Sequence, residues 1–256
     1  MTNNPDVEKL LTWLRTTLAD YVLEPIALYR AGLRQTYPLI AVSESDLRAK
    51  LESGGHFIAL PKEPAALANI IEVAVVDFLV QRIEDFPNAT IKRGTERGYP
   101  DIEINGSYFG GGFHAVDIKV ARRSKSGQQT DSRITLYTGN TYFRYPQLHW
   151  SSTLRPFQEY ASHLDVIALY TLNEQQGSRI EDLRLVAHEP WQIASKQRSS
   201  TTREYIGAVM SIADLEAGRG EFDSEAEFYA YWRKYPFKIG RAVQQQLDKL
   251  LQARQS

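Results

Sequence analysis

Two acidic residues and a lysine are spaced so that two neighbouring strands could bring them together. The segment YPDIEI (99–104) is followed by a glycine-rich turn and then by FHAVDIKV (113–120). Side chains alternate between the two faces of a strand, so Asp117 and Lys119 project side by side from a strand whose other face is apolar. Asp101 opens the preceding strand, and pairing of the two strands across the turn would bring it beside Asp117.

Such a group could carry out a displacement at phosphorus. Two carboxylates that converge in a partly buried place repel each other unless a cation lies between them. Mg²⁺ accepts oxygen ligands of this kind, usually one or two carboxylates with water and substrate phosphate completing its shell. The Lys119 ammonium could orient or deprotonate a water molecule, or stabilise charge that develops on a phosphoryl oxygen. Metal, water and cation together suit in-line displacement, so Mg²⁺ is the expected cofactor.

The elements that must position these residues are predicted from hydrophobic periodicity. Runs rich in β-branched and aromatic residues predict strands over 90–92, 102–104, 113–120, 134–137, 166–172 and 183–187. Apolar residues at three- and four-residue spacing predict helices over 7–26, 65–83, 155–163, 212–217 (closed by Gly218), 224–235 (capped by Asp223) and 239–253. The pattern predicts an α/β (α+β) fold, with a central mixed sheet flanked by helices. We expect residues 1–60 to form a helical N-terminal arm, within the same domain or at a dimer contact, and residues 61–256 to form the domain that carries the site.

Composition excludes several other classes of protein. The chain has 256 residues, of which 43% are hydrophobic and 24% charged, as in ordinary soluble globular proteins. It has no cysteine, which excludes disulfide scaffolds, cysteine-ligated zinc, iron–sulfur clusters and thiol nucleophiles. No segment is apolar over the roughly 18 residues that suggest a membrane span, and the N-terminus is polar. We therefore expect a cytoplasmic location and no membrane partner.

The formal net charge of −1 gives no overall sign of a polyanionic partner. The charges are nevertheless unevenly distributed. Residues 119–133 contain five lysines and arginines against one acid, residues 196–203 are basic, and residues 221–227 are acidic. A neutral total is therefore compatible with local contacts to DNA phosphates.

Pro100, Asp101, Asp117 and Lys119 resemble the signature of the PD-(D/E)-x-K nucleases, in which Asp-x-Lys follows Pro-Asp at about this separation. Further segments resemble the EcoRV-like type II restriction endonucleases, in the order that this family requires: 134–136, 142–144, 158–171, 206–207 and 218–235. The resemblance covers roughly residues 65–240. It implies a restriction-endonuclease-like fold.

The resemblance also implies an activity and a set of site residues. EcoRV-like enzymes are Mg²⁺-dependent homodimers that cut both strands of a short palindromic DNA site, leaving 5′-phosphates. Asp101, Asp117 and Glu72 would be the metal ligands, and Lys119 the cation at the scissile phosphate. Glu72 stands on an otherwise apolar helix, so a glutamate at the rim of the core is the alternative interpretation. Glu103, farther along its strand, ranks below Glu72. A DNA methyltransferase of the same specificity is implied as a functional partner.

Two polar segments correspond in position to the family's DNA-reading loops. Residues 195–203 match a major-groove recognition loop and residues 93–98 a minor-groove loop, although each could be a solvated surface turn. Arg and Lys can bind guanine edges, Gln adenine, and Ser or Thr either base. The predicted contacts with double-stranded DNA are made by Thr95, Arg97, Arg122, Arg123, Thr135, Thr141, Tyr142, Arg144, Lys196, Arg198, Ser199, Ser200, Thr201, Thr202 and Arg203.

Two other functions stay open at this point. A nuclease of the same fold could recognise junctions, flaps or mismatches in repair or recombination, and a DNA-binding protein could keep the fold without cleaving. The presence of all four candidate catalytic residues favours cleavage. The histidines show no ligand spacing, so structural roles are predicted for His56, His114, His149, His163 and His188.

Overall fold

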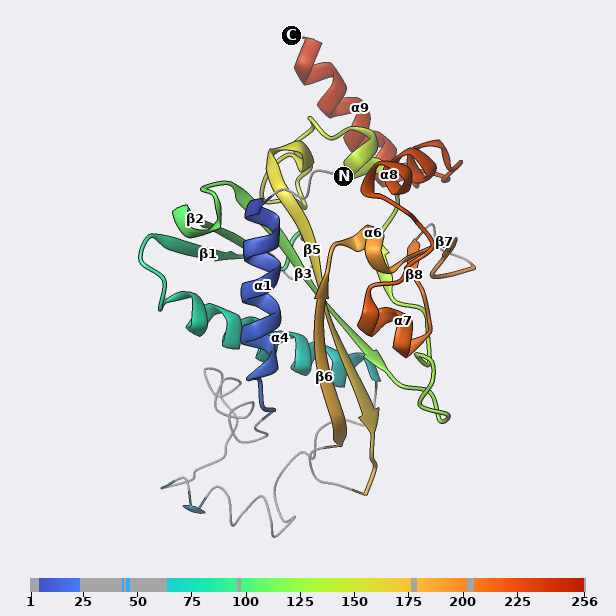
Figure 1. The fold of residues 1–256 in the computed structure, drawn as a ribbon. Coiled ribbons are helices and arrows are strands. Elements are labelled where there is room, and N and C mark those ends of the chain that lie inside the picture. The colour runs from blue at the N-terminus through green and yellow to red at the C-terminus, as the bar shows by residue number, and fades with distance from the viewer. Residues whose placement is uncertain are drawn as a thin grey trace.

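The computed structural model describes residues 5–23, 43, 45–46, 64–95, 98–175, 179–201 and 205–255. The helices are α1 (Pro5–Ala19), α4 (Pro64–Ile83), α5 (Thr141–Arg144), α6 (Pro190–Ile193), α7 (Ile212–Ala217), α8 (Glu225–Lys234) and α9 (Arg241–Gln255), with single 3-10 turns η1 (Ser107–Phe109) and η2 (Phe157–Glu159). The strands are β1 (Ala89–Arg93), β2 (Ile102–Gly106), β3 (Phe113–Arg122), β4 (Thr135–Tyr137), β5 (Tyr160–Leu172), β6 (Ile180–His188), β7 (Ala194–Arg198) and β8 (Ile206–Ala208). Figure 1 shows their arrangement.

The strands form two sheets. The larger has the order β1-β2-β3-β5-β6, in which β3 and β5 run parallel and the other neighbours antiparallel. The smaller is antiparallel, in the order β4-β8-β7. A mixed sheet with flanking helices is the predicted fold class, which the structure confirms.

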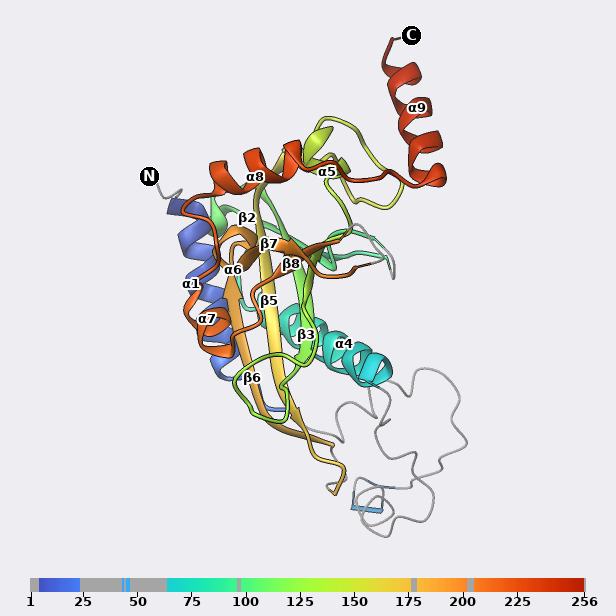
Figure 2. The same cartoon turned by 90° about the vertical axis from the view of Figure 1, so that its right-hand side faces the viewer.

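The larger sheet buries both of its faces, each against a different set of elements. On one face, Val116 and Ile118 of β3 pack with α1 and α4 in one hydrophobic cluster. On the other face, Ala115 and Ala121 belong to a second cluster, formed with the smaller sheet and with α6, α7 and α8. Figures 1 and 2 show these layers, and Figure 2 shows α9 extending away from the rest of the molecule. Alternation therefore sends Asp117 and Lys119 toward the second cluster.

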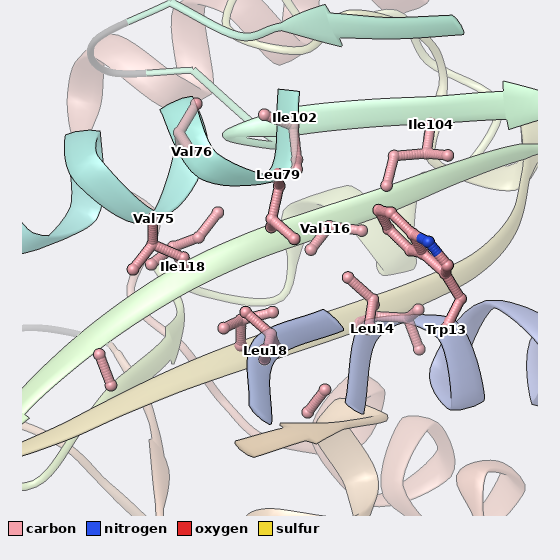
Figure 3. Packing of buried hydrophobic residues seen from close by; sticks show 14 of the residues in the cluster. Trp13, Leu14, Leu18, Val75, Val76, Leu79, Ile102, Ile104, Val116 and Ile118 are labelled. Atoms are coloured by element: carbon pink, nitrogen blue, oxygen red, sulfur yellow. The ribbon is translucent and has the colours of Figure 1, made fainter. Parts of the chain in front are cut away.

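The core under α1 and α4 is formed mainly by apolar side chains. Figure 3 shows Trp13 and Leu14 of α1 lying against the strands, with Leu79 of α4 meeting Ile102 and Val116. Leu14, Leu79 and Ile102 are fully buried. This packing holds β2 and β3 together from behind, so the face that carries Asp117 is supported by a rigid layer.

The structure describes the predicted N-terminal arm mainly through α1. This helix packs on β6 and places Leu10, Leu11 and Leu14 in the core. Most of residues 24–60, including the end of the predicted helix near Ile26, lie outside the described residues. Within the described ranges, no helix combines the length and the apolar character that crossing a bilayer requires.

Local capping explains where the late helices begin and end. Ser211 and Ser224 accept backbone N–H bonds from Asp214 and Glu227, at the N-termini of α7 and α8. Gly218 ends α7 in the left-handed conformation, with φ 65°, as the sequence predicts. The N-cap of α8 is Ser224, whereas the sequence pattern indicated Asp223.

The predicted helix over 155–163 is wrong. Pro156 has an extended backbone, a single 3-10 turn follows, and β5 begins at Tyr160. Ser162 and His163 pair in register with His114 and Ala115 of β3. Sheet pairing with a distant segment outweighs the weak local helix preference, because each added pair completes backbone hydrogen bonds in the interior of the sheet.

Candidate active site

Asp101 and Asp117 are interlocked through each other's backbone. β2 and β3 pair antiparallel with Ile102 opposite Val116, which sets Asp101 beside Asp117. The Asp101 N–H donates to Asp117 Oδ1 over 3.2 Å, and the Ile118 N–H donates to Asp101 Oδ2 over 2.6 Å. The structure therefore brings together the two carboxylates that the strand pattern predicted to meet.

Lys119 completes this group. Its Nζ donates to Asp117 Oδ2, and the two side chains are 23% and 9% exposed. An ammonium that is mostly withdrawn from water is stabilised strongly by a neighbouring carboxylate, because the local dielectric constant is lower than that of water. Lys119 is thus held at a defined position beside both acids.

The charges of the group shift its proton affinities. Burial and the negative charge of Asp117 raise the pKa of Asp101 from 3.8 to about 7, although Lys119 and the Ile118 N–H act in the opposite direction. Burial would lower the pKa of Lys119, but Asp117 and Asp101 outweigh it and raise that pKa above its ordinary value. Lys119 is therefore an ammonium at neutral pH, while Asp101 keeps its proton to a higher pH than an ordinary aspartate when no metal is bound.

We expect the contribution of Asp101 to the stability of the metal-free chain to fall as the pH rises from about 4 to about 7. Below its unfolded pKa of 3.8, Asp101 is protonated in both states and contributes nothing. Above its folded pKa of about 7, the folded chain bears the full cost of the buried charge. Urea unfolding in EDTA across this range gives the slope of the free energy of unfolding against pH. The difference in slope between the wild type and Asp101→Asn measures the contribution of Asp101. An unchanged slope in that variant would mean that Asp101 does not titrate in this window.

Glu72 approaches the same group from α4. It is half-buried, and burial raises its pKa. The charge of Lys119 opposes this shift, whereas the charge of Asp117 adds to it. Its charge therefore acts on both residues, while its neighbours Ile71 and Val75 are in the core. Glu72 lies at the edge of the acid–acid–lysine group, which the apolar helix pattern alone did not establish.

The donor set fits a hard divalent cation. Among the described residues, no three His, Cys, Asp or Glu side chains are grouped closely enough to hold a metal ion by themselves. Mg²⁺ usually takes one or two protein carboxylates, with water and substrate phosphate supplying the rest. Asp101 and Asp117 provide that number of carboxylates, and they repel each other when no cation is bound.

A cleft of about 600 Å³ opens in front of the group. The acids Asp101, Asp117 and Glu72 line it together with Lys119. Its other polar lining residues are Tyr99, Ser132, Arg133, Thr135, Tyr137, Thr138, Tyr142 and Tyr205. The cleft thus exposes the charged group to a ligand that reaches the smaller sheet as well.

Glu103 does not belong to this group. It is 5% exposed, and its carboxylate accepts two hydrogen bonds from Arg155, at 2.5 and 2.8 Å. Burial and pairing commit it to a structural ion pair. This agrees with its rank below Glu72.

We expect Glu103→Ala to lower the free energy of unfolding by about 3 kcal/mol, because it leaves the guanidinium of Arg155 without its buried partner. Glu159 is the matched control, since it pairs with the same arginine at 3.5 Å but is 50% exposed. Glu159→Ala should cost less than about 1 kcal/mol. Urea denaturation of the two variants measures both values. Equal losses would contradict the assignment of Glu103 to the fold.

The histidines in the described residues take no part in the site. His114 contacts Ser162 Oγ at 2.8 Å and the Phe109 carbonyl at 2.9 Å, and burial lowers its pKa. Burial lowers the pKa of His163 to about 3, and its Nδ1 lies 2.6 Å from the hydroxyl of Tyr99. These are interior contacts of neutral rings. His56 lies outside the described residues.

Two of the predicted DNA contacts line the cleft. Thr135 shares a hydrogen bond of 2.7 Å with Ser199, which ties the recognition segment to β4. Tyr142 stacks near Tyr99 and contacts Ser152 Oγ at 3.0 Å. The structure therefore brings Thr135, Ser199 and Tyr142 to one side of the acid–acid–lysine group.

The predicted recognition loop, residues 195–203, is not wholly a loop. Residues 194–198 form β7, so Lys196 and Arg198 lie on a strand of the smaller sheet. Lys196 pairs with Glu227 of α8 at 3.2 Å. Ser200 and Thr201 follow in the connecting segment, Thr201 exposed and Ser200 half-buried. Thr202 and Arg203 lie outside the described residues, as does Arg97 of the other predicted loop, where Thr95 is exposed.

Arg122 is the last residue of β3, and Arg123 follows it. Neither Arg122 nor Arg123 lines the cleft. Arg122 pairs with Asp131, and Arg123 donates to the carbonyls of Leu169 and Asp182. Position next to Lys119 in the sequence did not bring them to the same place, since both are taken up by contacts around the ends of β3, β5 and β6.

Two further candidates share the short helix α5 with Tyr142. Thr141 lines a smaller hollow of about 120 Å³, next to the start of α9, and Arg144 is exposed with its guanidinium over the ring of Tyr145. Neither lines the larger cleft.

Several residues at or beside the cleft have no distinctive pattern in the sequence. Arg133 lines the cleft and donates to the Ala208 carbonyl at 2.6 Å and to Gln197 Oε1 at 2.9 Å; its only sequence signal was membership of a basic tract. Tyr99 and Tyr137 also line the cleft, but buried tyrosines have no distinctive spacing. Asp165 lies opposite Asp117 on β5, and an acid within an apolar run was its signal.

The chain matches known restriction endonucleases over most of its length. The sequence profile of the family described as restriction endonuclease EcoRV matches residues 35–254. The type II restriction enzyme EcoRV of Escherichia coli is 21% identical over 206 residues, which are 74% of this chain and 82% of that protein. Together with a mixed sheet that presents Asp101, Asp117 and Lys119 to a cleft, this match shows that the chain belongs to the EcoRV family of restriction endonucleases.

Proposed function

We propose that this chain is a Mg²⁺-dependent deoxyribonuclease that cuts both strands of a short palindromic duplex site, acts as a homodimer and leaves 5′-phosphates. The interlocked pair of Asp101 and Asp117, with the Lys119 ammonium beside it in the cleft, carries the proposal. Two neighbouring carboxylates with a single lysine as counter-charge repel each other and destabilise the folded chain. They suit a site that a divalent ion and a phosphate complete.

The chain's own residues divide the work. Asp101 and Asp117 would hold the ion, and Glu72 is the nearest further carboxylate. When bound, Mg²⁺ would supply positive charge at the scissile phosphate. Lys119 would donate a hydrogen bond to a phosphate oxygen and stabilise the charge that develops there. Its raised pKa favours this role over that of a base toward the attacking water, the other role that the sequence left open.

DNA would enter along the cleft and meet the smaller sheet. Thr135 and Tyr142 line this path, and Ser199 is hydrogen-bonded to Thr135. Residues 195–203 would reach base edges in the major groove and residues 93–98 the minor groove, while Thr135, Thr141, Tyr142 and Arg144 would contact the DNA backbone. A two-fold palindrome calls for a two-fold protein, so a homodimer follows from the substrate. A methyltransferase of the same specificity would protect the host's own sites.

Incubation with plasmid DNA and Mg²⁺ tests the function. Discrete fragments are expected, with none in EDTA, and sequencing their ends would give the site and the cut position. Ligation without prior kinase treatment would confirm 5′-phosphates. A smear would contradict site specificity, preference for flaps or junctions would indicate a repair nuclease, and binding without cleavage would indicate a DNA-binding protein.

A further inference from the structure

β5 carries an acid in an otherwise apolar run, directly beside the proposed metal ligands. Asp165 is the register partner of Asp117 in the parallel pair of β3 and β5. Neighbouring strands lie about 4.8 Å apart and partners point to the same face, so Asp165 faces the same side of the sheet as Asp117 and Lys119. Its neighbours Leu164, Val166 and Ile167 belong to the hydrophobic core.

Asp165 is buried and incompletely bonded. It is 2% exposed, and its Oδ2 is buried without a hydrogen-bond partner among the described residues. Buried polar atoms in native proteins nearly always have a partner, so an exception of this kind calls for an explanation. Burial raises the pKa of Asp165 well above its ordinary value; the charge of Lys119 lowers it, and the charges of Asp117 and Asp101 raise it.

Asp165 does not touch the substrate path. It is absent from the lining of the cleft, whereas Asp101, Asp117 and Lys119 all line it. Any part that Asp165 takes in the reaction must therefore pass through another side chain. Lys119 lies two residues beyond the register partner of Asp165 on β3, lines the cleft, and is the cation whose charge acts on Asp165.

The ammonium of Lys119 and a bound divalent ion would compete for the carboxylate of Asp117. Without metal it donates to Asp117 Oδ2, an oxygen of a proposed metal ligand. A divalent cation on Asp117 would repel the ammonium and compete for the same oxygens. The lysine side chain is largely buried, and a buried ammonium that loses its carboxylate is strongly destabilised. It therefore needs a second acceptor within reach.

We propose that Asp165 is that acceptor: a positioning residue that holds the Lys119 ammonium in the site when a divalent ion takes the carboxylate of Asp117. The proposal rests on the proposed metal site. Asp165 would thereby keep Lys119 beside the scissile phosphate instead of letting it compete with the ion. The unpartnered Oδ2 is then the atom that is reserved for the metal-bound state.

Mn²⁺ binding to the DNA-free chain, measured by the paramagnetic resonance of the free ion, tests this in a double-mutant cycle. Asp165→Asn should weaken Mn²⁺ binding about tenfold when Lys119 is present. Without Asp165 as an acceptor, the Lys119 ammonium stays on Asp117 and competes with the ion for its oxygens. Lys119→Met alone should tighten binding, since it removes the competitor. In the Lys119→Met background, Asp165→Asn should change binding less than about twofold, because the ammonium through which Asp165 acts is then absent.

Controls separate this role from loss of the fold. Thermal melting would show whether each variant is folded. If the asparagine variant does not fold, Asp165→Leu, which introduces no new buried polar group, would be used to repeat the cycle. Asp131→Asn is the matched control, because Asp131 also pairs with a β3 cation, Arg122, outside the cleft. It should leave Mn²⁺ binding unchanged.

The outcomes are distinguishable. Equal weakening by Asp165→Asn in both backgrounds would show that Asp165 acts on the ion directly, and no weakening in either would show that it is structural; both results overturn the proposal and leave the proposed function standing. Absence of Mn²⁺ binding by the wild-type chain would overturn the metal site itself, and the positioning role with it.

Discussion

An Asp117→Ala chain is expected to bind its DNA site and to cut it at least about a hundredfold more slowly than the wild type. Loss of groups that merely orient metal ligands typically costs ten- to a hundredfold, and loss of a ligand should cost no less. Asp117 also accepts the Asp101 N–H and the Lys119 ammonium, so one substitution loosens all three groups. Its removal relieves the repulsion that raises the pKa of Asp101, but it also takes the carboxylate partner from the Lys119 ammonium, so the melting temperature is measured beside the activity.

Cleavage under single-turnover conditions and gel retardation in Ca²⁺ would separate catalysis from binding. Asp131→Asn serves again as the control, since Asp131 is an exposed acid outside the cleft. Wild-type cleavage by Asp117→Ala would remove Asp117 from the mechanism. Loss of both binding and cleavage, with an unchanged melting temperature, would instead assign Asp117 to DNA recognition.

Lys119→Met is expected to reduce cleavage by about 10²- to 10⁴-fold, the range found when a positioned group that handles charge or protons in the transition state is lost. The reason is electrostatic, because the variant lacks the cation at the phosphate. Its metal binding should persist, in contrast to Asp117→Ala, since the ammonium competes for an Asp117 oxygen. Comparison of Mn²⁺ binding with cleavage rate in the two variants therefore distinguishes a ligand from a charge donor.

Lys119→Arg keeps the positive charge and is the matched control. Its planar guanidinium does not fit the place of a compact ammonium, so partial recovery relative to Lys119→Met is expected. The pKa of Lys119 is raised, so cleavage should show no rise that follows lysine deprotonation at alkaline pH. Such a rise, or full activity in Lys119→Met, would contradict the assigned role.

The central part of the site could be predicted because it depends on short-range patterns. Two residues on one strand, Asp117 and Lys119, share a face by alternation alone, and a glycine-rich turn makes the pairing with Asp101 the simplest arrangement. The caps of α7 and α8 are equally local, which is why their positions were predicted to within one residue. The helix predicted over 155–163 failed because pairing with β3 is not visible in the segment itself.

Other parts depended on contacts between distant segments. Arg122 ends β3 and Arg123 follows it directly, yet Arg123 donates to the carbonyls of Leu169 on β5 and Asp182 on β6. Glu103 follows Ile102 on β2, close in sequence to Asp101, but its partner Arg155 comes from a segment about fifty residues later. Charge and proximity in the sequence therefore did not decide which cations face the cleft.

By itself, the sequence determined the class of the fold and the acid–acid–lysine group, because alternation, turns and caps are set by residues a few positions apart. Only the tertiary structure decided that Lys119 pairs with Asp117, that Glu72 reaches them from α4 and that Asp165 lies beside Asp117. These relations follow from strand register and helix packing, which are selected by the free energy of the whole core and not by any single segment.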